Sequence, residues 1–452
     1  MKFTPKYDSG FLPMSVVIRD FENDVKKAEN KTLKICVERN DGYNYIYDLK
    51  IFADESKNER NYGVAERIIK SILWVTGGYK IYLAGDDYIY GRIKADYTES
   101  GARAFDVDFM QTVYEKPFEV IRADGDFPKF NPCMVKIGGH LEGCRIGFDA
   151  GGSDRKVSAV IDGKVVYSEE VVWFPKINSD YRYHYDGILT AMKTAASKMP
   201  RVDAIGVSSA GVYINNRIMV ASLFLKVPKE DFKSHVQTMY LDVAKEIGAP
   251  IEVANDGDVT ALAGAIDLKD DSVLGIAMGT SEAGGYINDK GLLNGWLSEL
   301  AFVPVDFNKV AMKDEWSGDY GCGVKYFSQD SVIKLAENGG YKFKEGSSPA
   351  EKLKEIQALM EKNDGLAKDI YRDIGIYLGY AIPYYARFYK IKHLLLLGRV
   401  TSGAGGAIIV DTAKEVLKAE FPEYADVDIT MPDESNKRVG QSIAAASLPE
   451  IK

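Results

Sequence analysis

The sequence contains little cysteine, little histidine and no long apolar run. Four cysteines are scattered over 452 residues, and no two of them form a CxxC pair. This excludes a disulfide framework and a zinc site built on paired cysteines, and reduced thiols are expected. The four histidines are not spaced as metal ligands. The cysteines are Cys36, Cys133, Cys144 and Cys322.

The strongly apolar stretches, such as residues 394–397, are far shorter than the roughly 20 residues that span a bilayer. The start, MKFTPKYDSGFLPMSVV, lacks the basic segment and apolar run of a signal peptide. The 57 Lys and Arg against 66 Asp and Glu give a net charge of −9, and both signs are mixed along the chain. We therefore expect no membrane or nucleic-acid partner, and a cytoplasmic location.

What the sequence does contain is typical of a large globular protein. Apolar residues make up 46% and charged residues 27%, and the length predicts two to four domains of roughly 150 residues. The first 140 residues mix strand and helix patterns, and glycines at 138, 139 and 143 indicate a junction. From Arg145 onward strands alternate with helices, which favours an α/β fold.

Several local signals predict individual elements. Asn40-Asp41-Gly42 and Asp162-Gly163 each lie between two strand-like runs, and each predicts a β-hairpin. Asp231 is expected to cap a helix that runs to about residue 247. The C-terminal third is expected to be mostly helical, with helices over residues 349–362, 366–389, 404–420 and 436–448 and strands over 393–397 and 427–430.

Two segments combine a strand with a small-residue turn that suits a phosphate. In IGFDAGGS, Asp149 ends a strand and two glycines let the backbone approach an anion closely, while the carboxylate can hold hydrated Mg²⁺. In GIAMGTSEAGG, a second strand runs into a similar turn. A tight turn and a glycine-rich hairpin are the alternative interpretations.

Two further segments have a related character. LLLLG followed by TSGAGG opens a helix with glycines that can lie flat beneath an adenine or ribose; an ordinary turn is the alternative. In VANDGD, Asp256 stands where a strand becomes a helix, a suitable place for a carboxylate that accepts a proton from an attacking hydroxyl. A plain helix cap is the alternative there.

The order of these four segments resembles that of the ROK family, part of the sugar kinase, actin and Hsp70 superfamily, whose members include bacterial glucokinases, fructokinases, N-acetylhexosamine kinases and related repressors. The resemblance covers residues 145–448. IGFDAGGS is similar to the family's phosphate-1 turn, and VANDGDVTALAGA to the segment ENDANAAALGE, whose Asp is the family's catalytic base. MGTSEAGGYINDKGLLNGWLSEL is similar to GTGIGGGIIINGKL followed by GEIGH. AIGVSSAGVYINNRI, YGCGVKYFSQDSV, LLLLGRVTSGAG and RVGQSIAAASL match further family segments in the same order.

The resemblance implies a two-lobed, actin-like ATPase fold of the ribonuclease H-like type, with residues 1–140 as an extra N-terminal α+β segment. Lobe 1 would contain residues 145–265 and the C-terminal helix 435–448, and lobe 2 residues 266–434. The two lobes would close over a cleft that holds ATP, Mg²⁺ and a sugar. The resemblance also implies a homo-oligomer, a dimer.

Site residues are carried over from the matching motifs. Asp256 would be the general base. The sugar would be bound by Asn255, Glu299, Ser209 and Gly211. ATP would be bound by Asp149, Gly151, Gly152, Ser153, Gly279, Thr280, Gly398 and Ser402, and Asp149 would also hold Mg²⁺.

The sequence departs from the family pattern at the zinc site and in the sugar pocket. Of the family's zinc-binding cysteines only Cys322 remains, and Phe302 stands at the histidine position, so no zinc is expected. Cys322 is then most simply a buried small residue. With Phe302 and Val324 in place of polar groups, one side of the sugar pocket should be apolar, which disfavours unsubstituted glucose.

The phosphate-2 and adenosine turns also depart from the pattern. Ser281, Ala283, Arg399 and Val400 replace family glycines. Glu282 brings a carboxylate beside the expected phosphates, which would weaken ATP binding unless the side chain points away or holds Mg²⁺.

The leading hypothesis is an ATP-dependent kinase of a carbohydrate or polyol hydroxyl. The alternative is a sugar- or nucleotide-sensing protein that has kept the cleft and lost turnover, which the altered turns favour. A third possibility concerns the aromatic residues of the N-terminal segment, which could form a subunit interface or simply pack in its core. They include Tyr88, Tyr90, Phe105, Phe109, Tyr114 and Phe118.

Overall fold

The computed structural model describes the chain at residues 1–133, 137–432 and 434–451, and these residues form two compact units. Unit 1 contains residues 1–133, 276–284 and 295–431. Unit 2 contains residues 137–275, 285–294 and the end of the chain from Pro432. The N-terminal segment thus belongs to the same unit as most of the C-terminal half. The two units do not test the lobe boundaries expected from the sequence, which remain a prediction.

Unit 2 is built on a five-stranded sheet in the order β11-β8-β5-β6-β7. Three of its strands are parallel, namely β5 (Cys144–Ala150), β8 (Ala204–Ser209) and β11 (Ile251–Asn255). β6 (Asp154–Ile161) and β7 (Lys164–Val172) continue antiparallel from β5, and they form the hairpin predicted at Asp162-Gly163. A small hairpin of β9 (Val212–Ile214) and β10 (Arg217–Val220) follows β8.

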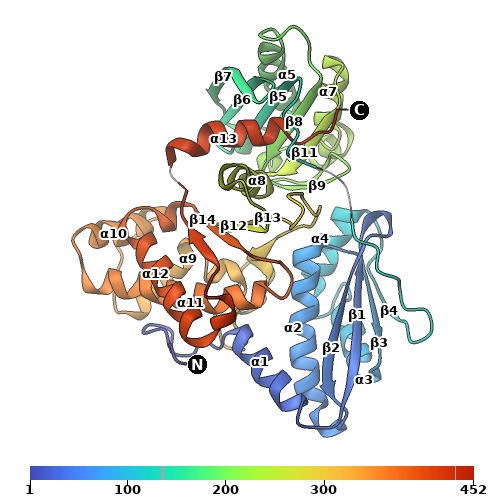
Figure 1. Ribbon diagram of the computed structural model, residues 1–452, viewed down its shortest axis with the longest axis vertical. Helices are drawn as coiled ribbons and strands as arrows, with labels where there is room; N and C mark the ends of the chain where they lie inside the picture. The colour runs from blue at the N-terminus through green and yellow to red at the C-terminus, as the bar shows by residue number, and fades with distance from the viewer. Residues whose placement is uncertain (134–136, 433, 452) are drawn as a thin grey trace. The chain divides into compact units, whose positions relative to one another are not determined.

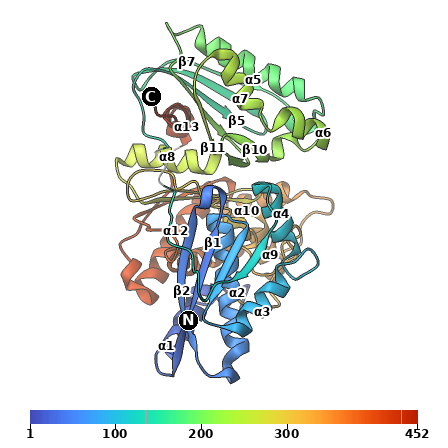
Figure 2. The same cartoon turned by 90° about the vertical axis from the view of Figure 1, so that its right-hand side faces the viewer.

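Helices cover both faces of this sheet (Figure 2). On one face lie α5 (Tyr181–Ala196) and α7 (Met239–Ile247), and on the other α8 (Asp256–Leu268) and α13 (Glu434–Ala446). α13 lies directly on the strands because they carry glycines below it. A Cβ on Gly147 would lie 2.1 Å from the carbonyl oxygen of Ser442, and one on Gly206 would lie 1.6 Å from that of Ala445.

The helix expected to begin after Asp231 begins earlier. A short helix α6 (Lys229–Asp231) continues into a π-helical turn (Phe232–Val236) before α7 starts. Asp231 therefore lies within the helical segment and its side chain makes no cap hydrogen bond, so the predicted cap is wrong. Pro228 precedes the first turn with φ −55°, a value that suits entry into a helix.

The N-terminal part of unit 1 is a four-stranded sheet in the order β2-β1-β3-β4, and α2 runs along it (Figure 1). β1 (Asn30–Glu38) and β2 (Asn44–Phe52) form the hairpin predicted at residues 40–42. β3 (Lys80–Ala84) pairs antiparallel with β1 and parallel with β4 (Glu119–Arg122). The helices of this part are α1 (Met14–Val25), α2 (Asn58–Thr76), α3 (Asp87–Asp96) and α4 (Ala104–Tyr114).

α2 is an inner helix, because every residue from Val64 to Thr76 is buried. It nevertheless carries Glu66, Arg67 and Lys70 in this stretch, and buried charges need partners. The aromatic rings of α4 also face this helix. Phe109 and Phe105 pack on Trp74 with ring centroids 4.9 and 5.9 Å apart. Phe105 and Phe109 are half-buried, and their packing on Trp74 favours intramolecular packing over a subunit interface.

A second four-stranded sheet has the order β13-β12-β14-β15, with β14 and β15 parallel. Its strands are β12 (Val273–Met278), β13 (Glu282–Ile287), β14 (His393–Leu397) and β15 (Asp428–Thr430). The helices of this region are α9 (Gln329–Asn338), α10 (Pro349–Glu361), α11 (Gly365–Tyr385) and α12 (Ala404–Glu420). The predicted helices and strands of the C-terminal third are confirmed to within a few residues.

The mixed sheets flanked by helices confirm the predicted α/β class, and the N-terminal segment is α+β as expected. In the described part of the chain, no helix has the length and apolar character needed to cross a bilayer.

Candidate functional site

The first predicted phosphate turn connects β5 to β6 in unit 2. Gly151 has no room for a side chain, because a Cβ there would lie 2.7 Å from the carbonyl oxygen of Asp154. Trp173 holds this turn from the end of β7. Its indole Nε1 donates to the Gly151 carbonyl oxygen at 2.7 Å, and its backbone N–H donates to that of Ser153 at 3.1 Å. The turn is thus fixed by hydrogen bonds to its carbonyls, which leaves its backbone N–H side for an anion.

Asp149 stands at the end of β5 beside this turn. Its Oδ1 accepts a hydrogen bond from the hydroxyl of Ser208 at 2.8 Å, and its Oδ2 lies 3.9 Å from the ammonium of Lys156. Burial raises the pKa of Asp149, although Ser208 and Lys156 oppose the rise. The hydroxyl of Ser153 donates to Asp154 at 3.1 Å.

The sequence analysis did not identify Lys176, whose cationic side chain lies at this turn. A Cβ on Gly152 would lie 3.1 and 3.2 Å from Cε and Nζ of Lys176, so the lysine side chain lies against the glycine. The signal that could have found it is the β6–β7 register. Because Asp154 pairs with Val172, the residues after β7 must return beside the turn at 151–153. Hairpin register therefore brings Lys176 beside the turn at 151–153.

Asp256 is the first residue of α8 and follows directly from β11. Its carboxyl Oδ1 accepts from the N–H of Gly257 at 3.0 Å, and its side chain is partly exposed. Burial and the nearby charge of Asp149 raise the pKa of Asp256 to about 6. Unit 2 thus brings together the predicted base, the predicted Mg²⁺ ligand and one glycine turn.

Three predicted sugar-binding residues lie in the same region of unit 2. Asn255 caps α8, because its Oδ1 accepts from the N–H of Gly257 at 2.8 Å, and its Nδ2 donates to the carbonyl of Gly211 at 2.8 Å. Gly211 has φ +143°, a value that glycine accommodates most readily. The hydroxyl of Ser209 is buried and accepts from Tyr240 at 3.1 Å. Asn255 therefore has a structural role, because it links the start of α8 to the loop at Gly211.

Unit 1 brings the second and third predicted turns together. A Cβ on Gly398, at the end of β14, would lie 2.4 Å from the carbonyl oxygen of Met278, the last residue of β12. The turn at 279–281 is closed by a 2.9 Å hydrogen bond from the N–H of Gly279 to the carbonyl of Ser281, and Thr280 at its tip is exposed.

A cavity of about 300 Å³ lies at these two turns within unit 1. Its wall contains Gly279, Arg399 and Ser402 together with residues of α10. Gln357 of α10 donates from Nε2 to the carbonyl of Arg399 at 2.7 Å, which ties the helix to the Gly398 turn. The remaining lining residues are Gln329, Ala350, Leu353 and Lys354. Gly279 of the predicted phosphate-2 turn and Ser402 of the predicted adenosine turn thus line one cavity, while Thr280 and Gly398 are not among its lining residues.

Glu282 points away from the phosphate-2 turn, one of the two conditions under which no repulsion was expected. Its side chain is 3% exposed and its Oε1 accepts from the hydroxyl of Tyr385 at 3.4 Å. Its Oε2 lies toward Gly323, where a Cβ would be 2.3 Å away. Burial raises the pKa of Glu282 well above its ordinary value, which favours the neutral form of this carboxyl.

Glu299 and Phe302 contact α2 of the N-terminal segment. The N–H groups of Ser298 and Glu299 donate to the carbonyls of Val75 and Trp74 at 2.9 and 3.1 Å. The ring of Phe302 packs on that of Trp74 with centroids 4.2 Å apart. Val324, at the other altered position, is buried in a small cluster with Cys322.

Cys322 is buried, and its sulfur lies 3.9 Å from the ammonium of Lys70. Burial raises the pKa of this thiol to about 12. No group of three or more His, Cys, Asp or Glu side chains that could hold a metal is present among the described residues. The expected absence of zinc stays a prediction.

Comparison with known proteins agrees with this geometry. The ROK family model matches residues 145–446. A ROK hexokinase from Thermus thermophilus superposes with a TM-score of 0.53 at 16% identity, covering 67% of this chain and 97% of that one. A ROK family transcriptional regulator, described as a homologue of the E. coli MLC protein, gives 0.52 at 18% identity, covering 68% and 79%.

A glucokinase from Parabacteroides distasonis gives a TM-score of 0.50 at 15% identity, covering 68% of this chain and 96% of that one. A search among curated proteins found no match. At these identities the structural likenesses establish the actin-like ATPase fold alone. The family model spans residues 145–446, which is well over half of the chain, and the chain therefore belongs to the ROK family.

Proposed function

We propose that this protein is an ATP-dependent kinase that phosphorylates a hydroxyl group of a carbohydrate, such as a hexose, an amino sugar or a related polyol. The observation that carries the proposal is the position of Asp256, which begins α8 beside Asp149. Family membership alone leaves the choice between kinase and regulator open, because both occur among the similar structures.

Asp256 would accept the proton of the sugar hydroxyl as its oxygen attacks the terminal phosphorus of ATP. A pKa of about 6 suits this role, because the carboxyl is then deprotonated at neutral pH and still basic enough to take a proton. By the family resemblance, Asn255, Gly211 and Glu299 would hold the sugar.

The residues around Asp149 fit a magnesium ion. Ser208 occupies one carboxylate oxygen, and the other is 3.9 Å from Lys156, beyond hydrogen-bond distance, so it can ligate a hard cation or one of its waters. Bound Mg²⁺ would offset negative charge on the β- and γ-phosphates. Lys176, lying against Gly152, would add a second positive charge at the same turn.

The cavity of unit 1 fits the adenosine part of ATP. The Gly398 turn and α10 form its walls, and Ser402 and Gln357 offer polar groups to a ribose or a base. Because the Glu282 side chain is buried against Tyr385 and Gly323, we do not expect it to oppose the phosphates. Glu282, one of the altered residues that favoured a sensor in the sequence, therefore counts little against a kinase.

The test is release of ADP from Mg-ATP with a panel of hexoses and amino sugars. With its acceptor, the wild-type protein should turn over, and Asp256→Asn should lower kcat about 10²–10⁴-fold, the usual contribution of a general base. Thermal shifts by ATP should remain, because Asn keeps the shape of the side chain. A folded wild-type protein that releases no ADP with any sugar would overturn the proposal.

A non-catalytic sensor is the second candidate, favoured by Arg399, which lines the cavity where the family has glycine. A sensor should show sugar-dependent thermal shifts without turnover. Those shifts should be the same in the wild type and in Asp256→Asn.

A further inference from the structure

The C-terminal end of α2 holds the backbone of Glu299. The last carbonyls of a helix have no partner within the helix, and those of Trp74 and Val75 accept instead from the N–H groups of Glu299 and Ser298. Two hydrogen bonds to consecutive residues fix both the position and the orientation of this peptide. The ring of Phe302 on Trp74 adds a third contact a few residues further on.

The short turn at 299–303 is held on its other side by residues 321–324. The N–H of Gly323 donates to the carbonyl of Val303 at 2.9 Å, and the N–H of Val305 donates to that of Gly321 at 2.8 Å. The segment that carries Glu299 thus lies between α2 and the loop at residues 319–324. Its position depends on the distance between this helix and this loop.

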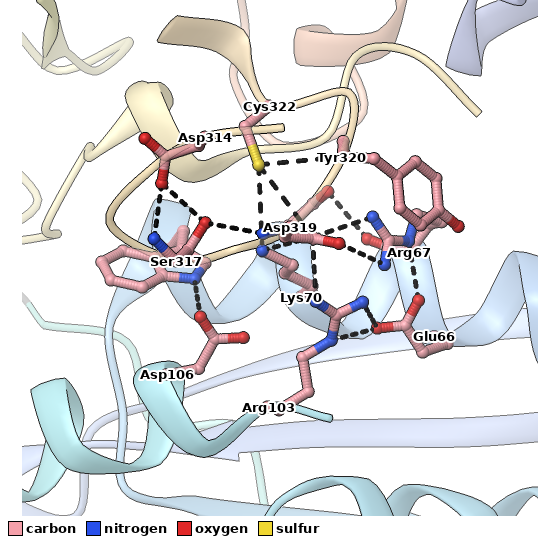
Figure 3. A network of polar contacts seen from close by, with 12 residues as sticks. Glu66, Arg67, Lys70, Arg103, Asp106, Asp314, Ser317, Asp319, Tyr320 and Cys322 are labelled. Atoms are coloured by element: carbon pink, nitrogen blue, oxygen red, sulfur yellow. Dashed lines mark hydrogen bonds and ion pairs between the residues drawn. The ribbon is translucent and has the colours of Figure 1, made fainter. Parts of the chain in front are cut away.

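A buried ionic cluster connects α2 to this loop (Figure 3). Asp319 accepts from Arg67 at 2.9 and 3.3 Å and from Arg103 at 2.8 Å, and it is also bonded to Lys70. Glu66 accepts from Arg67 at 2.7 Å and from Arg103 at 2.6 Å. Three cations from the N-terminal segment therefore converge on one carboxylate of the 314–322 loop.

This cluster is buried, and its ion pairs are also hydrogen bonds of defined geometry. The side chains of Lys70, Arg67 and Asp319 are 0%, 1% and 5% exposed. Burial by itself would raise the pKa of Asp319, yet Lys70 and Arg67 hold it below its usual value. Buried ion pairs contribute little net stability compared with apolar packing, but they fix geometry, because each hydrogen bond must be satisfied in one arrangement.

We propose that Lys70 and Asp319 are positioning residues for substrate binding, which act through α2 on the segment that carries Glu299. The N-terminal α+β segment would then be a working part of the sugar site. This inference rests on the proposed function in one respect, the assignment of Glu299 as a sugar contact.

The test uses Lys70→Met and, as a matched control, Lys334→Met. Lys334 is another largely buried lysine of unit 1, paired with Asp8 at 2.9 Å, and it lies on α9. Both variants should melt at lower temperature than the wild type. Only Lys70→Met should raise the sugar KM, by at least tenfold, with the KM for ATP within twofold of wild type.

Hydrogen exchange of a peptide covering residues 297–303 separates this inference from the proposed function. In Lys70→Met its amides should exchange at least tenfold faster than in the wild type, and in Lys334→Met they should not. If the wild type has no sugar turnover, the proposed function fails while the exchange result still decides the positioning. Equal exchange in the two variants, or an equal rise of the two KM values, would overturn the inference.

Asp319→Asn is the second variant, used if Lys70→Met does not fold. It keeps the shape of the side chain and one carbonyl acceptor but removes the charge on which the three cations converge. It should give the same split, with faster exchange at 297–303 and a higher KM for the sugar alone. Wild-type exchange in this peptide would overturn the inference.

Discussion

At the scale of single residues, the clearest chemical statement concerns Asp256. Its pKa is raised to about 6 by burial and by Asp149, so protonation inactivates it as a base at mildly acid pH. For the kinase, kcat/KM for the sugar should be level above pH 7 and should fall about tenfold per unit below pH 6. Initial rates between pH 5 and 8 at saturating ATP would measure this. A thermal melt at each pH controls for unfolding, and a level profile down to pH 5 would contradict the assignment.

A second expectation at this scale concerns Lys176. Its ammonium lies against Gly152, so replacing it with methionine should remove a charge-assisted contact to phosphate and raise the KM for ATP about five- to tenfold. The matched control is Lys164→Met, an exposed lysine at the start of β7. Steady-state kinetics with ATP as the varied substrate would decide, and equal KM values in the two variants would remove Lys176 from the site.

The residues that sequence analysis could find are those fixed by local structure. Asp149 and Asp256 stand at ends of strands next to glycines or a helix start, and both positions can be recognised from a few neighbours. The position of Glu282 could not be recognised in this way. Whether its carboxyl points to the turn or into the core is decided by Gly323 and Tyr385, which are distant in sequence.

At the scale of elements, the contact between α13 and the sheet of unit 2 depends on Gly206. A Cβ there would lie 1.6 Å from a backbone oxygen, which no side-chain rotation can relieve. Gly206→Ala should therefore destabilise the protein by about 3 kcal/mol or more, as overpacking does. Gly91→Ala is the control, because Gly91 lies in α3 with open space around it and should gain up to about 1 kcal/mol. Denaturant melts would compare the two, and similar midpoints would show that α13 can move away.

Element types were predictable where hydrophobic period and turn chemistry agree, as at the hairpins around Asn40-Asp41-Gly42 and Asp162-Gly163. The start of the helix near Asp231 was not predictable, because the π-helical turn that follows this residue has no recognisable cap in the sequence. The burial of α2 was also hidden. From the sequence alone its charged residues suggest a helix exposed to solvent, because Asp319, the partner that allows them to be buried, lies far along the chain.

At the scale of the whole molecule, residues 1–133 are part of unit 1 and not an attached module. A chain beginning at residue 137 would lose the carbonyls that bind Ser298 and Glu299, and would leave Asp319 without its three cations. We expect this fragment to be insoluble or to lack a cooperative melt, as judged by size-exclusion chromatography and circular dichroism. Coexpression of residues 1–133 should restore a soluble complex. A monodisperse 137–452 fragment with a cooperative transition would contradict this expectation.

The ionic cluster also bears on synthesis of the chain. Arg67 and Asp319 are 252 residues apart, so at about 5–20 residues per second the ribosome needs roughly 10–50 s to deliver the counter-charge after α2 has emerged. During that interval Arg67 and Lys70 of α2, and Arg103 just before α4, lack the Asp319 carboxylate on which they converge. The earliest-made part of this protein must therefore wait for one of the later parts before it can finish folding.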